Sequence, residues 1–563
     1  ASGKVVFQII PDVYVKQVEL AGSFGVRFKM KLFWYTYKHN FSIWSGKYKW
    51  NNVRAMLLKA IYNSDSYSED MRDYLKDRSE WLGDADETVR ESESTVLQRS
   101  SYTDIKPQIV VCGNTTMMLF LDDDGSDGFN YQHLFYSLYD TAAGKWSTPV
   151  RVDSGNLADI EFEAFSNGDK IYVTYIKSGE VTDENKANHS EVISTFEVMV
   201  AEYDASKGKF VNHTNISEND SYDMNPQITA TDDGIVVVWI NNTTGDVFAQ
   251  NANNVIYMRK YVSGKWEAVK AVTGYGALIT SMDIGRLDGK LYIAAVRDID
   301  CDYSTETDRI VVLIDENGNV TEMKTINNKN DAVKFVNLNG KEMLMWYNGF
   351  NLYKVESAQD TPVFIFENGL SGLTPDYKLI QIDTDTYALL YTIQEKYTDD
   401  DGNDCCGSDI YAVLFKDGVW SNPVTLTRTA DDRYVDGFDV LVYDGNLIIP
   451  YISTFADFSN ENLYIVSDFM SVQVKLDYDI ELSDCKTDSD TLFDGDDLGI
   501  WCEIRNNSLI RTEYINIRIL DSKGNTVYEQ NVPCFIKEGE TVIEYISIPK
   551  ELLLCGDVYT LYV

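Results

Sequence analysis

The sequence PQITATDDGIVVVW, residues 226–239, contains two short apolar runs joined by an Asp-Gly turn. An Asp-Gly pair between runs rich in β-branched residues is typical of a β-hairpin, because both central residues of the tight turn take a positive φ. The second run ends on an aromatic residue, Trp239. This stretch therefore predicts the first two strands of a small antiparallel sheet.

The same pattern recurs along the chain at intervals of roughly 45 to 65 residues, a spacing typical of radial arrays of small sheets. The second run of each repeat stops at one of seven positions, of which all but Ala295 are aromatic: Phe120, Tyr175, Trp239, Ala295, Trp346, Tyr391 and Tyr451. A third run follows in each repeat, and three repeats have a fourth that carries Trp146, Trp266 or Trp420. We therefore predict an all-β fold built on a seven-bladed β-propeller over residues 105–475.

The seventh repeat has no tryptophan-bearing fourth strand. An open ring would leave sheet edges exposed, so we expect another segment to complete this blade. The sequence leaves two candidates open: residues 95–100, upstream of the propeller, and residues 471–475, at its end.

Two further segments flank the predicted propeller. Residues 1–104 are predicted to form a small N-terminal segment with strands over 3–45, helical spacing over 50–83 and a linker. Residues 476–563 have strands at β-sandwich spacing. Four of the eight cysteines lie in this last segment and allow two disulfides in three connectivities: Cys485, Cys502, Cys534 and Cys555. Because the chain begins within a strand pattern and stops on an apolar run, we expect it to be part of a larger multidomain protein.

Composition narrows the classes of partner and chemistry. The formal net charge of −40 disfavours a nucleic acid or an anionic membrane as partner. No apolar run approaches the roughly 20 residues of a membrane-spanning helix, so we expect no membrane insertion. The four histidines have neither metal-ligand nor catalytic spacing, and no phosphate-binding glycine loop or nucleophile elbow is present. We assign no catalytic residue.

Three acidic loops follow the second strands of three repeats. They contain Asp122, Asp124 and Asp127; Asp298, Asp300 and Asp302; and Asp399, Asp401 and Asn403. Carboxylates at alternate positions near a glycine can surround Ca²⁺ with oxygen ligands, although none of these loops completes an EF-hand. A solvated acidic turn is the alternative at each loop. Their shared position on one rim leads us to name calcium as the candidate cofactor.

The aromatic residues at the strand ends have two interpretations. In the first, they pack between neighbouring blades. In the second, Trp239, Trp346 and Tyr347 reach a rim and stack on the face of a sugar, which would make them ligand-binding residues.

The runs FLDDDG (120–125), LFYSLYD (134–140) and WSTP (146–149) resemble the sialidase-like and related propeller modules of large secreted surface proteins of gut Gram-positive bacteria. The resemblance implies a secreted or cell-surface bacterial protein. Three features depart from true sialidases: the Asp-box motif has no full match, the family usually has six blades, and no motif identifies three substrate-binding arginines. The available arginines are Arg99, Arg151, Arg286 and Arg297.

The last segment is similar to adhesion-type immunoglobulin-like (CARDB-like) domains of bacterial surface proteins. The residues that carry this similarity are Asp494-Gly495-Asp496, the alternating Leu498, Ile500, Cys502 and Ile504, the run 505–508, and Glu538-Gly539-Glu540-Thr541. Such domains serve as spacers or adhesion units, which implies an immunoglobulin-like β-sandwich after the propeller.

These observations together predict a non-catalytic extracellular binding or adhesion module that recognises a glycan or a surface protein through its propeller. Two alternatives remain open. A sialidase-like exo-glycosidase requires arginines and a carboxylate–tyrosine pair that converge on a central pocket. A structural spacer of a large surface protein requires neither these residues nor exposed aromatic rings.

Overall fold

The computed structural model describes five N-terminal strands between residues 3 and 51 and, with gaps, residues 95–562. The residues outside this description are 1–2, 10–12, 21–23, 33–34, 44–48, 52–94, 102–104, 124–129, 131, 181–188, 244–253, 275–277, 302–307, 326–327, 339, 349–350, 368–375, 385, 399–403, 417–418, 422, 428–433, 458–463, 477–479, 488–496, 507–511, 537–540, 550–551, 553–559 and 563. Most of the helical segment predicted at 50–83 lies among them.

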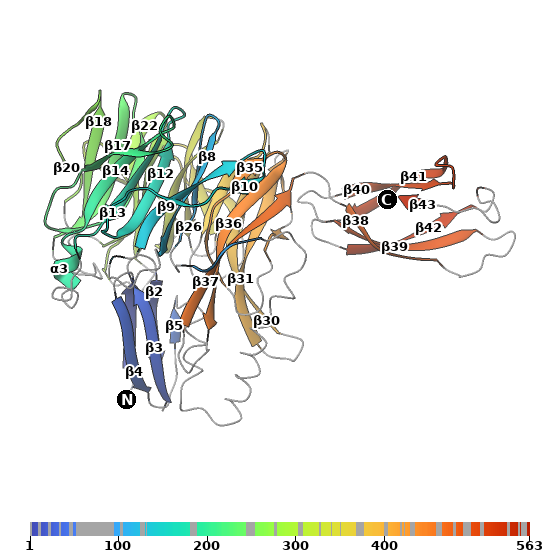
Figure 1. Cartoon of the computed structure of the whole chain (residues 1–563), viewed down its shortest axis with the longest axis horizontal. Helices are drawn as coiled ribbons and strands as arrows, with labels where there is room; N and C mark the ends of the chain where they lie inside the picture. The colour runs from blue at the N-terminus through green and yellow to red at the C-terminus, as the bar shows by residue number, and fades with distance from the viewer. Residues whose placement is uncertain are drawn as a thin grey trace.

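Seven antiparallel sheets form the predicted propeller (Figure 1). Blades one to three comprise β7 (Gln108–Cys112), β8 (Thr115–Asp123), β9 (Gln132–Asp140), β10 (Lys145–Trp146) and β11 (Val150–Arg151); β12 (Asp159–Ser166), β13 (Ile171–Lys177), β14 (Glu197–Asp204) and β15 (Lys209–Asn215); and β16 (Tyr222–Ala230), β17 (Gly234–Asn242), β18 (Asn254–Val262), β19 (Lys265–Trp266) and β20 (Lys270–Ala271). A short helix, α3 (His189–Ile193), follows β13.

Blades four to six have the same strand order. They comprise β21 (Leu278–Leu287), β22 (Lys290–Asp298), β23 (Arg309–Asp315) and β24 (Val320–Glu322); β25 (Asn330–Leu338), β26 (Lys341–Asn348), β27 (Asn351–Val355) and β28 (Val363–Glu367); and β29 (Tyr377–Gln381), β30 (Tyr387–Thr398), β31 (Asp404–Lys416), β32 (Val419–Trp420) and β33 (Val424–Thr425).

The seventh blade joins the two ends of the propeller. It contains β34 (Tyr434–Phe438), β35 (Leu441–Tyr443), β36 (Asn446–Asp457) and β37 (Tyr464–Lys475), and its outermost strand is β6 (Thr95–Ser101) from upstream of blade one. β6 pairs antiparallel with β37, so the first of the two predicted closures is confirmed. The segment 471–475 is itself the end of β37. Leu97 of β6 packs beside Phe120 of blade one and Phe469 of blade seven, so the closing strand lies against a core that spans the junction.

The first strands of five blades contain a register shift, in β12, β16, β21, β25 and β34. A bulge of this kind bends a strand and redirects its side chains. The first strands of these five blades are therefore bent at the shift.

The N-terminal strands form two small sheets. β1 (Gly3–Ile9), β2 (Val13–Leu20) and β5 (Lys49–Asn51) make one, and β3 (Phe24–Leu32) pairs with β4 (Tyr35–Ile43) in the other. β3 also contacts β37 of the seventh blade.

Two three-stranded sheets follow the propeller (Figure 1). One contains β38 (Ile480–Thr487), β39 (Leu498–Asn506) and β42 (Thr541–Ile548); the other contains β40 (Thr512–Leu520), β41 (Thr526–Ile536) and β43 (Thr560–Tyr562). Ile504 of the first sheet and Ile517 of the second belong to one buried cluster, so the two sheets share a core. Cys485 lies directly opposite Cys502 in the β38–β39 register.

Candidate functional site

The three aromatic residues proposed for sugar stacking lie inside the propeller. The exposed fractions of Trp239, Trp346 and Tyr347 are 0%, 1% and 5%. Trp239 packs against the core of blade two, and Trp346 against that of blade four. The rim interpretation of these residues is therefore corrected: the clusters that contain Trp239 and Trp346 combine residues of two neighbouring blades, so these aromatic side chains fill the space between blades.

Of the nine predicted calcium ligands, the structure describes Asp122, Asp298 and Asp300. Asp298 is buried and its Oδ2 lies 3.5 Å from Nε of Arg309, a cation that competes with a metal ion for the carboxylate. Burial and the neighbouring Asp300 raise the pKa of Asp298 to about 7. No group of three metal-ligating side chains gathers among the residues that the structure describes.

The remaining six predicted ligands lie outside the described residues: Asp124, Asp127, Asp302, Asp399, Asp401 and Asn403. Calcium binding by these loops therefore stays a prediction.

Two of the four arginines considered for substrate binding already have partners. Arg151 donates to Nδ1 of His133 at 2.8 Å and to the carbonyl of Gly155. Arg286 donates to Oδ1 of Asp232 at 2.6 Å. The side chain of Arg99 is not described.

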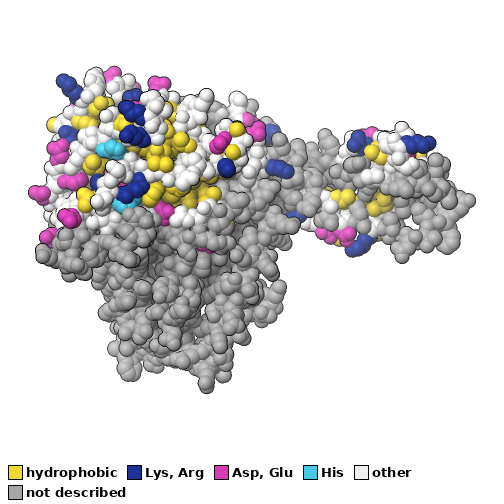
Figure 2. All heavy atoms as spheres, in the orientation of Figure 1, with side chains coloured by type: hydrophobic (Ala, Val, Ile, Leu, Met, Phe, Trp, Pro, Cys, Tyr) yellow, Lys and Arg dark blue, Asp and Glu magenta, His cyan; other side chains and the backbone are white. Residues whose placement is uncertain are grey.

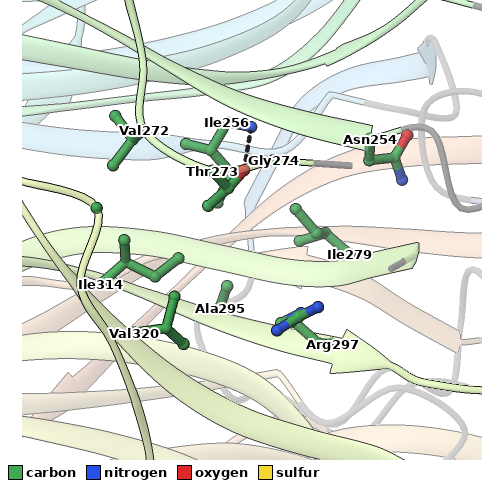
Figure 3. A pocket seen from close by; sticks show the side chains of 11 residues that line it. Asn254, Ile256, Val272, Thr273, Gly274, Ile279, Ala295, Arg297, Ile314 and Val320 are labelled. Carbon is green, nitrogen blue, oxygen red and sulfur yellow. Dashed lines mark hydrogen bonds between the residues drawn. The ribbon is translucent and has the colours of Figure 1, made fainter. Parts of the chain in front are cut away.

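Arg297 differs from these arginines. It is half-buried near the end of β22, and within the described part of the chain its guanidinium makes no hydrogen bond or ion pair. It lines a pocket of about 190 Å³ between blades three and four (Figure 3). In a chain with 89 acidic residues, a half-buried arginine without a carboxylate partner is available to bind an anionic group.

The pocket has a polar end and an apolar end. Figure 3 shows Arg297 and Asn254 at one end, with Val272, Ile314 and Val320 at the other. Aliphatic lining residues together with a few polar groups are typical of small-ligand sites, although the volume of this cavity is below the roughly 300–1,000 Å³ that drug-sized ligands occupy. It therefore suits one small group, such as a single sugar residue.

The polar groups of the pocket keep unused hydrogen-bonding capacity. Oδ1 of Asn254 accepts a bond from Nδ2 of Asn242 at 2.8 Å, which fixes the amide and leaves its NH₂ group to donate. Oγ1 of Thr273 accepts from the backbone N–H of Ile256 at 2.9 Å, and its hydroxyl proton remains available to a ligand. Arg297, Asn254 and Thr273 thus offer three donors.

A second group of polar side chains surrounds the propeller axis. Each blade contributes one such residue. In six blades this residue lies on the first strand and pairs with the second-strand residue directly before the strand-end position (Phe120 in blade one, Tyr175 in blade two, and so on). In the seventh blade, the N–H of Asp439 donates to the carbonyl of Pro450, which directly precedes Tyr451. We call these residues the axial ring: Gln108, Glu163, Gln227, Asp283, Lys334, Lys378 and Asp439. Glu163 of blade two interacts electrostatically with Asp283 of blade four and Lys378 of blade six, so these side chains converge on the axis.

Three axial-ring residues connect consecutive blades by the same hydrogen bond. Gln108 accepts from the N–H of Ala164 at 2.8 Å, Asp283 from Phe335 at 2.6 Å, and Asp439 from Ile109 at 2.7 Å. In each case the donor directly follows the axial-ring residue of the next blade. These bonds stabilise the ring of blades, including the junction between the last blade and the first.

The carboxylates of the axial ring have raised pKa values. Burial, together with the charge of Asp283, raises the pKa of Glu163 to about 7, although Lys378 and Lys334 oppose the shift. Burial also raises the pKa of Asp283 to about 6, against the hydrogen bonds that it accepts from Phe335 and Ile284. Protons therefore bind to these carboxylates near neutral pH.

Sequence reasoning missed both the pocket and the axial ring. The sequence does contain a signal for the axial ring, because the same Pro-Gln-Ile triplet occurs near the start of two blades, at residues 107–109 and 226–228. The pocket left none, because its residues come from strands of two blades that are separated by loops.

On the face drawn in Figure 2, basic side chains of the propeller are interspersed with acidic and hydrophobic ones. Among the described residues, no helix is long and apolar enough to span a membrane.

No protein-family model matches this sequence, and no curated protein matches it. Solved structures similar to the chain include a sialidase from Trypanosoma rangeli in complex with sialic acid (10% identity, TM-score 0.37, 69% of this chain and 58% of that one). Others are the NanB sialidase from Streptococcus pneumoniae (10%, 0.35, 68% and 70%) and the polysaccharide lyase Uly1 (12%, 0.38, 66% and 89%). The chain thus spans less than two thirds of the Trypanosoma enzyme. At these scores the likenesses carry no argument about activity.

Proposed function

We propose that this propeller is a non-catalytic binding head of a secreted or cell-surface protein and that its ligand is a glycan with an acidic sugar residue. The observation that carries the proposal is the half-buried Arg297 guanidinium, which has no described partner at the polar end of the pocket. A guanidinium matches a carboxylate with two parallel hydrogen bonds. Asn254 and Thr273 supply donors for sugar hydroxyls, and the apolar end receives the C–H face of the ring.

Binding agrees better with this pocket than catalysis does. Its lining residues include one arginine, one asparagine and one threonine, the rest being glycine or aliphatic. Glycoside hydrolysis ordinarily uses two carboxyl groups beside the scissile bond. The described lining contributes neither, so the pocket supports recognition.

Titration calorimetry of the full chain with glucuronic acid and N-acetylneuraminic acid tests this proposal. We expect Arg297→Gln to weaken binding about 10- to 100-fold, because charge-assisted hydrogen bonds contribute roughly 1.5–3 kcal/mol. The affinity of Arg297→Lys should lie between those of the wild type and Arg297→Gln, because lysine keeps the positive charge but lacks the planar guanidinium. Arg286→Gln is the matched control, because it removes an arginine whose carboxylate partner is already Asp232. Equal affinity of wild type and Arg297→Gln would contradict the proposal.

The other parts of the proposal have separate tests. Repeating the titration with Ca²⁺ and with EDTA tests whether calcium in the acidic loops supports the site. In the proposed arrangement, residues 476–563 are an immunoglobulin-like spacer of the larger protein. A spacer role without ligand recognition predicts no binding of either sugar.

An exo-glycosidase is the second candidate, because two carboxylates with raised pKa values, Glu163 and Asp283, converge on the propeller axis. Against it, both oxygens of Asp283 accept backbone hydrogen bonds, from Ile284 at 2.7 Å and from Phe335 at 2.6 Å. An enzyme would release 4-methylumbelliferone from an acidic glycoside, and Glu163→Gln would abolish the release. The binding proposal predicts no turnover in either protein.

A further inference from the structure

The sheet β38-β39-β42 carries two aromatic rings on its outer face. Trp501 of β39 lies directly opposite Tyr545 of β42, with ring centroids 4.7 Å apart and ring planes tilted by 48°. Their exposed fractions are 47% and 46%, and the adjacent Ile543 is 65% exposed. These values contrast with Trp239 and Trp346 in the propeller, which are buried.

The strand alternation explains why these side chains face outward. Ile500, Cys502 and Ile504 of β39 point into the core shared with the other sheet, so the intervening Trp501 faces the opposite way. Ile546 of β42 is buried in the same core, and Tyr545 before it is exposed. Neither ring belongs to the buried cluster that the described residues of the two sheets form.

Charged side chains border the aromatic pair. Lys486 of β38 lies opposite Trp501 on its other side and forms a 2.7 Å ion pair with Asp484, both exposed. Glu503 of β39 lies opposite Ile543. An apolar surface bordered by hydrogen-bonding groups matches a sugar ring, whose faces carry C–H groups and whose rim carries hydroxyls.

The size of the patch favours a small ligand over a second protein. The three exposed fractions correspond to roughly 300 Å² of apolar surface, given about 150–250 Å² for an aromatic side chain. A stable protein interface needs about 800 Å² on each partner. The patch therefore lacks the area for a stable dimer of this chain.

The ring geometry defines the ligand further. Rings tilted by 48° cannot lie together on a flat crystalline surface. Their 4.7 Å separation places both against one sugar residue. We infer that Trp501 and Tyr545 form a second carbohydrate site, which holds one neutral pyranose of a soluble glycan. This site is independent of the Arg297 pocket, because it lies on a different sheet and needs no anionic group.

Fluorescence titration of the full chain tests this inference. The probes are cellotetraose, mannotetraose and β-1,4-galactotetraose, with sorbitol as a polyol that has no pyranose face. We expect at least one tetrasaccharide, but not sorbitol, to bind and to change the fluorescence of Trp501. Trp501→Ala and Tyr545→Ala should each reduce affinity at least tenfold, whereas Trp501→Phe should retain part of it because it keeps an aromatic face.

Two controls separate binding from stability. Val363→Ala removes another exposed apolar side chain, 57% exposed on β28 of the propeller, and should bind as wild type. Because a cross-strand aromatic pair also stabilises a sheet, each variant is compared with the wild type by circular dichroism and melting temperature. Folded Trp501→Ala with unchanged affinity, or a wild type that binds none of the three glycans, would overturn the inference. Self-association of the wild type that Trp501→Ala abolishes would overturn it too.

Discussion

At the position of Gly285 in β21, two blades approach more closely than a side chain allows. A Cβ atom there would lie 2.4 Å from Cβ and Cγ of Phe335 in the next blade. Phe335 cannot easily move away, because its backbone N–H donates to Asp283 of the axial ring at 2.6 Å. Glycine is thus required by close packing between blades rather than by a special backbone conformation.

We expect Gly285→Ala to lower the free energy of unfolding by about 1–3 kcal/mol, the usual cost of overpacking. Urea denaturation followed by tryptophan fluorescence measures the change. Gly274→Ala is the control, because its added Cβ would meet nothing within 4 Å. Equal urea midpoints for Gly285→Ala and Gly274→Ala would contradict this prediction, because they would show that the two blades accommodate the added Cβ without loss of stability.

At the scale of elements, the closing strand β6 determines whether the ring is complete. Its partners in β37 lie more than 360 residues further along the chain, with Gln98 opposite Phe469 and Thr95 opposite Ser471. Without β6, β37 would expose a strand edge and the core beside Phe469 would lose Leu97.

Two truncations test this role. A chain that starts at residue 95 retains β6, whereas a chain that starts at residue 105 lacks it. We expect the second to melt at least several degrees lower than the first and to aggregate, because its seventh blade keeps an open edge. Differential scanning calorimetry and light scattering measure both effects. Similar melting temperatures without aggregation would contradict the role of β6.

The elements were more predictable than the site. Tight turns and apolar runs are local in sequence, so the seven hairpins and the aromatic ends such as Trp346 were visible. Whether such an aromatic faces a rim or a neighbouring blade depends on packing across the repeat, which the local pattern does not contain. The sequence therefore allows two interpretations of these aromatic residues, and the burial of their side chains decides between them.

The axial ring was harder to predict because its chemistry changes from blade to blade. Gln108, Glu163 and Lys334 occupy equivalent positions but carry no charge, a negative charge and a positive charge. These residues share a position opposite the second strand, and this position is defined only once the strands have paired. The Arg297 pocket shares this difficulty, since two blades build it.

At the scale of the whole molecule, several buried carboxylates link stability to pH. Burial raises the pKa of Glu163, Asp223 and Asp298 to about 7 and that of Asp159 and Asp283 to about 6. Because these values exceed those of the unfolded chain, the folded state binds more protons between about pH 4 and pH 7. Stability therefore rises as the pH falls through this range, and protonation also reduces the net charge of −40.

We predict that the melting temperature increases by at least a few degrees between pH 8 and pH 5.5. Glu163→Gln should raise the melting temperature at pH 8 and change it little at pH 5.5, because glutamine resembles the protonated carboxyl group. Scanning calorimetry across the pH series measures both. A melting temperature that falls steadily from pH 8 to pH 5.5 would refute this linkage.

In the proposed function, Arg297 binds the acidic group of a sugar. The most direct measurement is a crystal structure of the full chain soaked with glucuronic acid. We expect density in the pocket between blades three and four, with the sugar carboxylate within hydrogen-bonding distance of the Arg297 guanidinium and the ring against Val272 and Ile314. Density only at another site, or an empty pocket at a saturating concentration, would contradict it.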